Sequence, residues 1–204
     1  MSEKDYLQDI SEIKNMMSKS SQFISLSGLS GILAGIYALI GTVYAAYLLQ
    51  GTDPYSSVTP SDLVPQLTLT AAVILVLAIG TAVLLTYFKA KKTGDIFWNA
   101  TSRRLLLNFM IPLLSGGIFM LLLLKNHYYE LLAPVTLLFY GLACVNAAKY
   151  TFRDIHYLGI SMTVIGLVAT AFPGFALFFW ALGFGVCHIV YGSIMHYKYD
   201  RNPS

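Results

Sequence analysis

Residues 158–192 read LGISMTVIGLVATAFPGFALFFWALGFGVCHIVYG, an apolar stretch without a single Asp, Glu, Lys or Arg. Around its Pro173-Gly174 pair it belongs to two longer apolar runs, 156–172 and 175–197. Each run has the roughly 17–25 residues that a helix needs to cross about 30 Å of hydrocarbon. Backbone polar groups in lipid must be satisfied within their own segment, so both runs are predicted to be helices. The Pro-Gly pair predicts a tight turn, which makes the two helices an antiparallel hairpin.

Four more apolar runs precede this hairpin, at 23–49, 66–88, 105–124 and 130–148. Of the 204 residues, 56% are hydrophobic and only 11% are charged, whereas a soluble domain has about 25% charged residues. Because so few charges cannot solvate a surface in water, most of that surface must face lipid. The sequence therefore predicts an all-α polytopic membrane protein, with six transmembrane helices in three helical hairpins over residues 23–197.

The basic residues predict the orientation of the spans. Twelve of the thirteen Lys and Arg residues fall in segments on one side of the predicted membrane, and only Lys125 falls on the other. The positive-inside rule assigns the richly basic side to the cytoplasm. We therefore expect a plasma (inner) membrane protein with both termini cytoplasmic, so that segment 1–22 and a tail at 198–204 flank the spans.

Segment 1–22 is predicted to form a cytoplasmic amphipathic helix, because Ile10, Ile13 and Met17 recur at helical spacing with charged residues between them. Such a helix could lie on the membrane surface or dock on the cytoplasmic ends of the spans. Its net charge is slightly negative, which anionic lipid headgroups do not favour. We therefore expect it to dock.

The spans carry no Asp, Glu, Lys or Arg well inside them, which argues against a transporter driven by an intramembrane carboxylate. The titratable side chain nearest a bilayer centre is His188, which shares a helix face with Gly185 and Gly192. It could be a proton-responsive or ligand-binding group in the bundle. It could instead be a neutral histidine that hydrogen-bonds across to Asn146 or to a tyrosine, and we expect this second role.

Neither a metal nor a cofactor is expected. Cys144, Cys187 and His188 lie at similar depth, but their spacing matches no metal-binding signature, and buried cysteine usually behaves as a small hydrophobe. His156 and His196 could hold a haem iron between two helices, although histidines at a membrane face are more often solvated. No nucleotide-binding or hydrolase motif occurs, and we expect neither an enzyme nor a nucleic-acid partner.

Small residues recur along the first and last predicted spans. Gly28, Gly31 and Gly35 follow one another at steps of three and four, and Gly185 and Gly192 lie on one face of the last span. Without a hydrophobic drive between helices in lipid, such stripes bring two backbones into close contact. The contact could form within the bundle, or it could join two copies or a membrane partner.

The long cytoplasmic segment between the second and third spans is the most basic part of the chain. Its cations flank Phe97 and Trp98 and could bind anionic lipid headgroups, at about 1 kcal/mol per basic residue. The simpler interpretation is that they only enforce topology. The residues concerned are Lys89, Lys91, Lys92, Arg103 and Arg104.

The last hairpin resembles the helical-hairpin unit of HdeD-like acid-resistance membrane proteins, through Gly159, Gly166, Pro173-Gly174, Gly183 and Gly185. The glycine spacing in the first pair of spans is similar but fainter. The whole chain also resembles small six-span bacterial inner-membrane proteins. The resemblance implies a three-hairpin fold and a role in envelope stress or acid response.

Together these features favour a non-enzymatic membrane protein that acts through helix packing with itself or with a membrane protein partner in the lipid bilayer. The alternative is a transporter or channel for a small solute, with His188 lining the path.

Overall fold

The computed structural model describes residues 22–23, 25–50 and 60–201, and this part of the chain is helical and contains no strand. Six helices are long and apolar enough to cross a membrane. The predicted all-α fold with six spans is therefore confirmed, and the chain is a multi-pass membrane protein. The spans are α2 (Gly28–Gln50), α3 (Val64–Thr93), α4 (Ala100–Lys125), Tyr129–Tyr150 around α5 (Leu132–Ala147), α6 (Arg153–Ala171) and Pro173–Asp200, which contains α7 (Ala176–Trp180) and α8 (His188–Met195).

Two boundaries differ from the sequence prediction. The first span begins at Gly28 rather than at residue 23, and the last continues through a π-helical turn, His196–Asp200, into the segment predicted as a tail. Both differences arise from polar contacts at one end of the bundle, described below. The amphipathic helix predicted at 1–22 lies, except for Gln22, outside the described residues.

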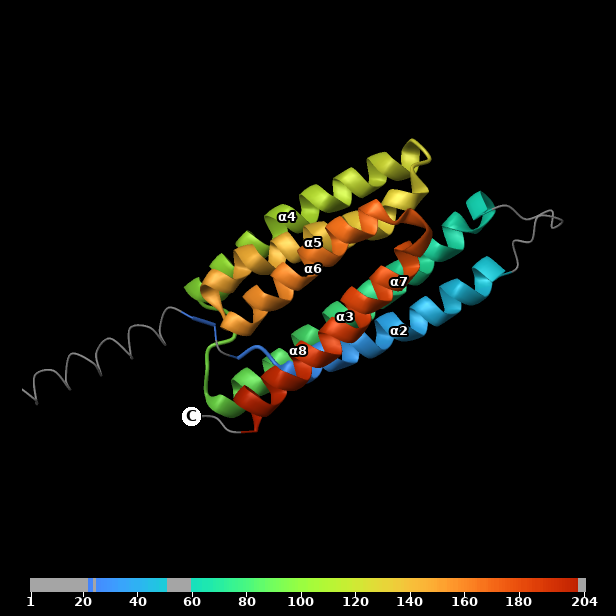
Figure 1. The fold of residues 1–204 in the computed structure, drawn as a ribbon. Helices are drawn as coiled ribbons and strands as arrows, with labels where there is room; N and C mark the ends of the chain where they lie inside the picture. The colour runs from blue at the N-terminus through green and yellow to red at the C-terminus, as the bar shows by residue number, and fades with distance from the viewer. Residues whose placement is uncertain (1–21, 24, 51–59, 202–204) are drawn as a thin grey trace, which may run out of the picture.

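The helices form two layers, one of α4, α5 and α6 and the other of α2, α3 and α8 (Figure 1). Within the first layer α5 packs on both α4 and α6, and within the second α2 packs on both α3 and α8. The last span joins the layers, because its π-helical segment Ala181–Cys187 contacts both α2 and α6. The last span in the sequence is thus a central helix in space.

Close backbone contact explains the glycine stripes of the first and last spans. A Cβ added at Gly35 would lie 2.6 Å from the Gly185 carbonyl oxygen, and one added at Gly192 would lie 2.6 Å from the Ile32 nitrogen. A Cβ added at Gly31 would lie 3.2 Å from the Gly192 Cα. The stripes therefore face each other inside one chain, so this surface of α2 is already occupied.

α3 and α4 are the outermost helices, and their most apolar stretches are 0% and 6% buried. Such exposure suits a surface that lipid covers. The ends of the described chain lie at the same end of the bundle (Figure 1). We call it the basic end, since α3 ends and α4 begins there with Lys91, Lys92, Arg103 and Arg104.

Candidate functional site

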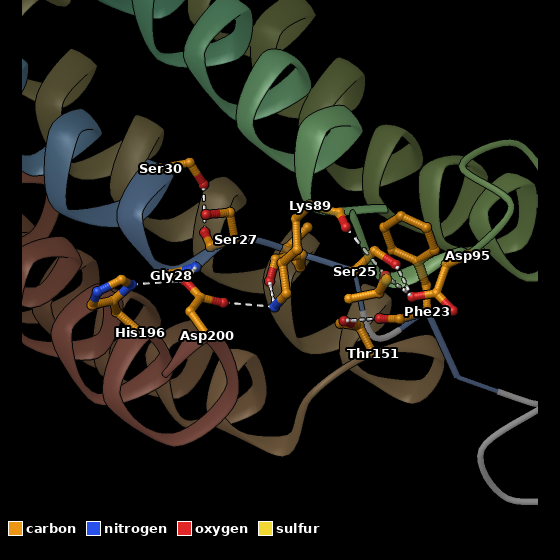
Figure 2. Close-up of polar contacts among 12 residues, drawn as sticks. Phe23, Ser25, Ser27, Gly28, Ser30, Lys89, Asp95, Thr151, His196 and Asp200 are labelled. Carbon is orange, nitrogen blue, oxygen red and sulfur yellow. Dashed lines mark hydrogen bonds and ion pairs between the residues drawn. The ribbon is translucent and has the colours of Figure 1, made fainter. Parts of the chain in front are cut away.

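The carboxylate of Asp200 holds three segments together at the basic end (Figure 2). It accepts hydrogen bonds from Lys89 Nζ at 2.6 Å, from His196 Nδ1 at 2.9 Å and from the Gly28 backbone N–H at 3.0 Å. Gly28 is the first residue of α2, where backbone N–H groups lack helical partners and the helix dipole favours a negative charge. The last span therefore caps the first one and pairs with the end of the second.

Lys89 is committed to this cluster. Its ammonium also donates to the Leu26 carbonyl at 2.9 Å and lies 5.5 Å from the centre of the Phe152 ring, and its side chain is only 15% exposed. The five basic residues grouped by the sequence therefore separate into two kinds. Lys89 is neutralised inside the chain, whereas the other four side chains are exposed.

The segment before α2 crosses the basic end as a strap, which we define as Phe23 and residues 25–27. The Phe23 N–H donates to the Tyr150 carbonyl at 2.7 Å, and Thr151 Oγ1 donates to the Phe23 carbonyl at 2.8 Å. Ser25 Oγ donates to an Asp95 carboxylate oxygen at 2.7 Å (Figure 2). The strap thus binds the connection between α5 and α6, which lies within one layer, and the connection between α3 and α4, which joins the two layers.

The turn at the end of the last span makes a second tie between the layers. Tyr199 stacks on Phe152 with ring centroids 3.9 Å apart, and its hydroxyl donates to Asp154 at 2.6 Å. Asp154 lies in the first turn of α6 and also pairs with Lys198 at 3.3 Å. The turn Lys198–Asp200 therefore contacts α6 through Tyr199 and α2 and α3 through Asp200.

His188 lies between the layers, halfway along the last span, and is only 6% exposed. Its Nδ1 is 3.2 Å from the Gly183 carbonyl oxygen, and its Nε2 is 2.8 Å from the Tyr140 hydroxyl on α5. A carbonyl can only accept, so Nδ1 carries the hydrogen, and when the ring is neutral its Nε2 accepts from the tyrosine hydroxyl. Both ring nitrogens are therefore satisfied, and the partner across the layers is a tyrosine rather than Asn146.

Asn146 has a different role, which follows from Pro112 inside α4. Proline has no N–H, so the carbonyl four residues earlier, that of Asn108, loses its helical donor. The Asn146 side chain reaches from α5 and donates to this carbonyl at 2.8 Å. A side chain of α5 thus supplies the hydrogen-bond donor that the proline removes from α4, since backbone polar groups in lipid need a partner within the protein.

The remaining candidates do not gather into a site. Among the described residues no three His, Cys, Asp or Glu side chains are grouped to hold a metal ion, and Cys144 and Cys187 are free thiols. His196 bonds to Asp200, and His156 packs against the Tyr157 ring. Every buried side-chain nitrogen or oxygen in the described part of the chain has a hydrogen-bond partner.

Sequence reasoning missed Asp200, whose carboxylate accepts three hydrogen bonds at the basic end. Its position three residues beyond an apolar run made it look like part of a solvated tail. Lys89, its strongest partner, lies 111 positions away in the sequence, and no local pattern links the two. The proline signal at position 112, by contrast, is readable, since any interior proline leaves a carbonyl without its donor.

Comparisons with protein-family models, with curated proteins and with solved structures find no match to this chain.

Proposed function

We propose that this chain is a non-enzymatic membrane protein that acts by binding a partner protein, and that its basic end faces the cytoplasm of the plasma (inner) membrane. The observation that carries the proposal is the complete pairing of buried polar side chains within the described residues. A catalytic or solute-binding interior keeps some polar groups free to meet its ligand. Here those groups already bond to other side chains or to backbone groups of the chain, so we assign the function to the outer surface.

The basic end is the part of that surface best suited to a partner. Phe23, at the start of the strap, packs edge-on against Phe97 of the connection between α3 and α4, with ring centroids 6.5 Å apart. The N-terminal end of the described chain therefore lies beside this connection, where Ile96 is 71% exposed. We propose that segment 1–21 and the connection together contact the partner, which is a membrane protein or a second copy of the chain.

Photo-crosslinking in cells tests this proposal. A photoreactive amino acid at Ile96 should capture a defined partner, whereas one at Phe175, which is 63% exposed at the opposite end, should capture only background. Deleting residues 2–21 should abolish the product at Ile96 while the protein still inserts. A strictly monomeric protein in nanodiscs, with equal background at both positions, would overturn the proposal. A role in envelope stress or acid response, which the HdeD-like resemblance implies, predicts that the partner is recovered in larger amount from acid-stressed cells.

The second candidate is a small-solute transporter or channel, favoured by the position of His188 and Tyr140 where the two layers meet. Relative movement of the layers would break this hydrogen bond, as alternating access requires of a contact at its midplane. Flux into liposomes that carry the protein, lost with His188→Ala and retained with a Cys187→Ala control, would establish this function in place of the first.

A further inference from the structure

The connection between α3 and α4 and the helix ends beside it carry cations that pair with no acidic side chain among the described residues. Lys91, Lys92, Arg103 and Arg104 are exposed, and the ion pairs of the described residues involve only other cations, Lys89, His196 and Lys198. Trp98, between the two basic pairs, is 59% exposed. Tryptophan is enriched at the level of lipid headgroups, which places the four cations at the same level.

Below two of these cations run apolar stripes that no protein covers. On α3, Leu84 and Phe88 precede Lys92 at steps of four residues and are 57% and 60% exposed. On α4, Leu107 and Ile111 follow Arg103 at steps of four and are 62% and 64% exposed. Residues four apart lie on one face of a helix, so each stripe is apolar towards the membrane centre and cationic at its end.

The two stripes stay uncovered because the helices belong to different layers. α3 packs on α2 and α4 packs on α5, although only residues 94–99 separate α3 from α4 in the chain. A phospholipid has the same profile as these stripes, with a charged headgroup above long apolar chains. Arginine adds a planar fork that suits phosphate oxygens.

We propose that anionic phospholipids bind at the two ends of the connection between α3 and α4, one on each stripe. One headgroup contacts Lys92 beside Lys91, the other contacts Arg103 beside Arg104, and the acyl chains of each lipid lie along the stripe next to it. Lys89 takes no part, because Asp200 holds it. This site lies on the same connection as the proposed partner-binding surface, but its test does not rest on that function, because it requires only the purified chain.

Native mass spectrometry of delipidated protein, titrated with phosphatidylglycerol or phosphatidylcholine, tests the headgroup contact. We expect phosphatidylglycerol to be retained and phosphatidylcholine to be lost. The variant Lys92→Gln/Arg103→Gln should weaken binding at each stripe about fivefold, because each lipid loses one basic residue worth about that factor. The matched control Lys149→Gln/Arg201→Gln removes two exposed cations from the same end and should change binding less than about threefold. Equal losses in both variants would mean general attraction to the basic end and would overturn the site.

A second arm separates a lipid from free phosphate. Phe88→Ser/Leu107→Ser removes exposed apolar contacts without disturbing the packed interior, so the protein should keep its thermal stability. It should bind phosphatidylglycerol about threefold more weakly, because each lipid loses one apolar contact with its acyl chains. If it instead binds phosphatidylglycerol as the unmodified protein does, and glycerol phosphate displaces the lipid at millimolar concentration, the site recognises phosphate alone and the lipid proposal is wrong.

Discussion

Replacing Asn146 by leucine tests whether α5 repairs the backbone of α4. The substitution nearly preserves volume but removes the amide that donates to the Asn108 carbonyl at 2.8 Å. Hydrogen bonds between side chains of membrane helices contribute about 0.6 kcal/mol on average and at most about 1.7. This one should lie near the upper end, because Pro112 leaves the carbonyl without its helical donor and an unsatisfied buried acceptor costs about 1–3 kcal/mol. We expect Asn146→Leu to lower the free energy of unfolding by about 1.5 kcal/mol.

The same substitution should be nearly harmless when Pro112 is absent. In a Pro112→Ala background the backbone N–H at position 112 can donate to the Asn108 carbonyl, so Asn146→Leu should then cost about 0.5 kcal/mol or less. The expected coupling of about 1 kcal/mol exceeds the roughly 0.3–0.5 kcal/mol within which independent substitutions add. Unfolding in bicelles, followed by steric trapping, measures all four corners of this cycle.

Asn126 provides the control, because its side-chain amide donates to a carbonyl of its own helix, Leu122, at the exposed end of α4. Asn126→Leu should cost less than about 0.5 kcal/mol in either background, since water can replace the lost donor. If Asn146→Leu costs the same with and without Pro112, the hydrogen bond does not serve the carbonyl that proline exposes, and the reasoning fails.

Three further predictions concern contacts between helices. Asp200→Asn should lower the unfolding free energy by about 2–3 kcal/mol, because it leaves the largely buried Lys89 charge without its partner. Adding Lys89→Met to this variant should recover part of the lost free energy in the same unfolding assay. Gly192→Ala should destabilise the protein by at least about 2 kcal/mol, since the added Cβ meets the backbone of α2. Gly80→Ala is the control, because a Cβ there meets nothing within 4 Å, and it should be neutral or stabilising. Equal shifts of the melting temperature in the two variants would contradict this prediction. Tyr140→Phe should cost about 1 kcal/mol by loss of one interlayer hydrogen bond, and an unchanged unfolding midpoint would show that the hydroxyl contributes nothing.

The six spans could be predicted because membrane thickness dictates helix length and the apolar runs meet it directly. The ends of the spans could not. Phe23 and Ser25 are as compatible with helix as the residues after them, but their backbone and side-chain groups bond to Tyr150 and Asp95 in distant connections. α2 therefore begins only at Gly28, where Asp200 caps it.

The sequence also could not specify which residues contact each other across the bundle. The glycine spacing predicted close backbone contact for Gly35 and Gly185, and the structure matches these two stripes to each other, a pairing that spacing alone cannot specify. His188 was correctly expected to hydrogen-bond across to a neighbouring helix, and its partner Tyr140 is one of fourteen tyrosines. Sequence identifies which side chains need a partner, and only the packing of helices decides which one they meet.

Because the last span is central in the fold, the first span can complete its contacts only late in biosynthesis. The first span cannot complete its glycine contact until residues about 150 positions later have left the ribosome, a delay of about 10–30 s at ordinary elongation rates. During that interval the cap of α2 is missing as well, because Asp200 has not been made. A nascent chain that stalls before the last hairpin therefore holds two half-assembled groups of helices in the membrane, with the glycine face of α2 still unfilled.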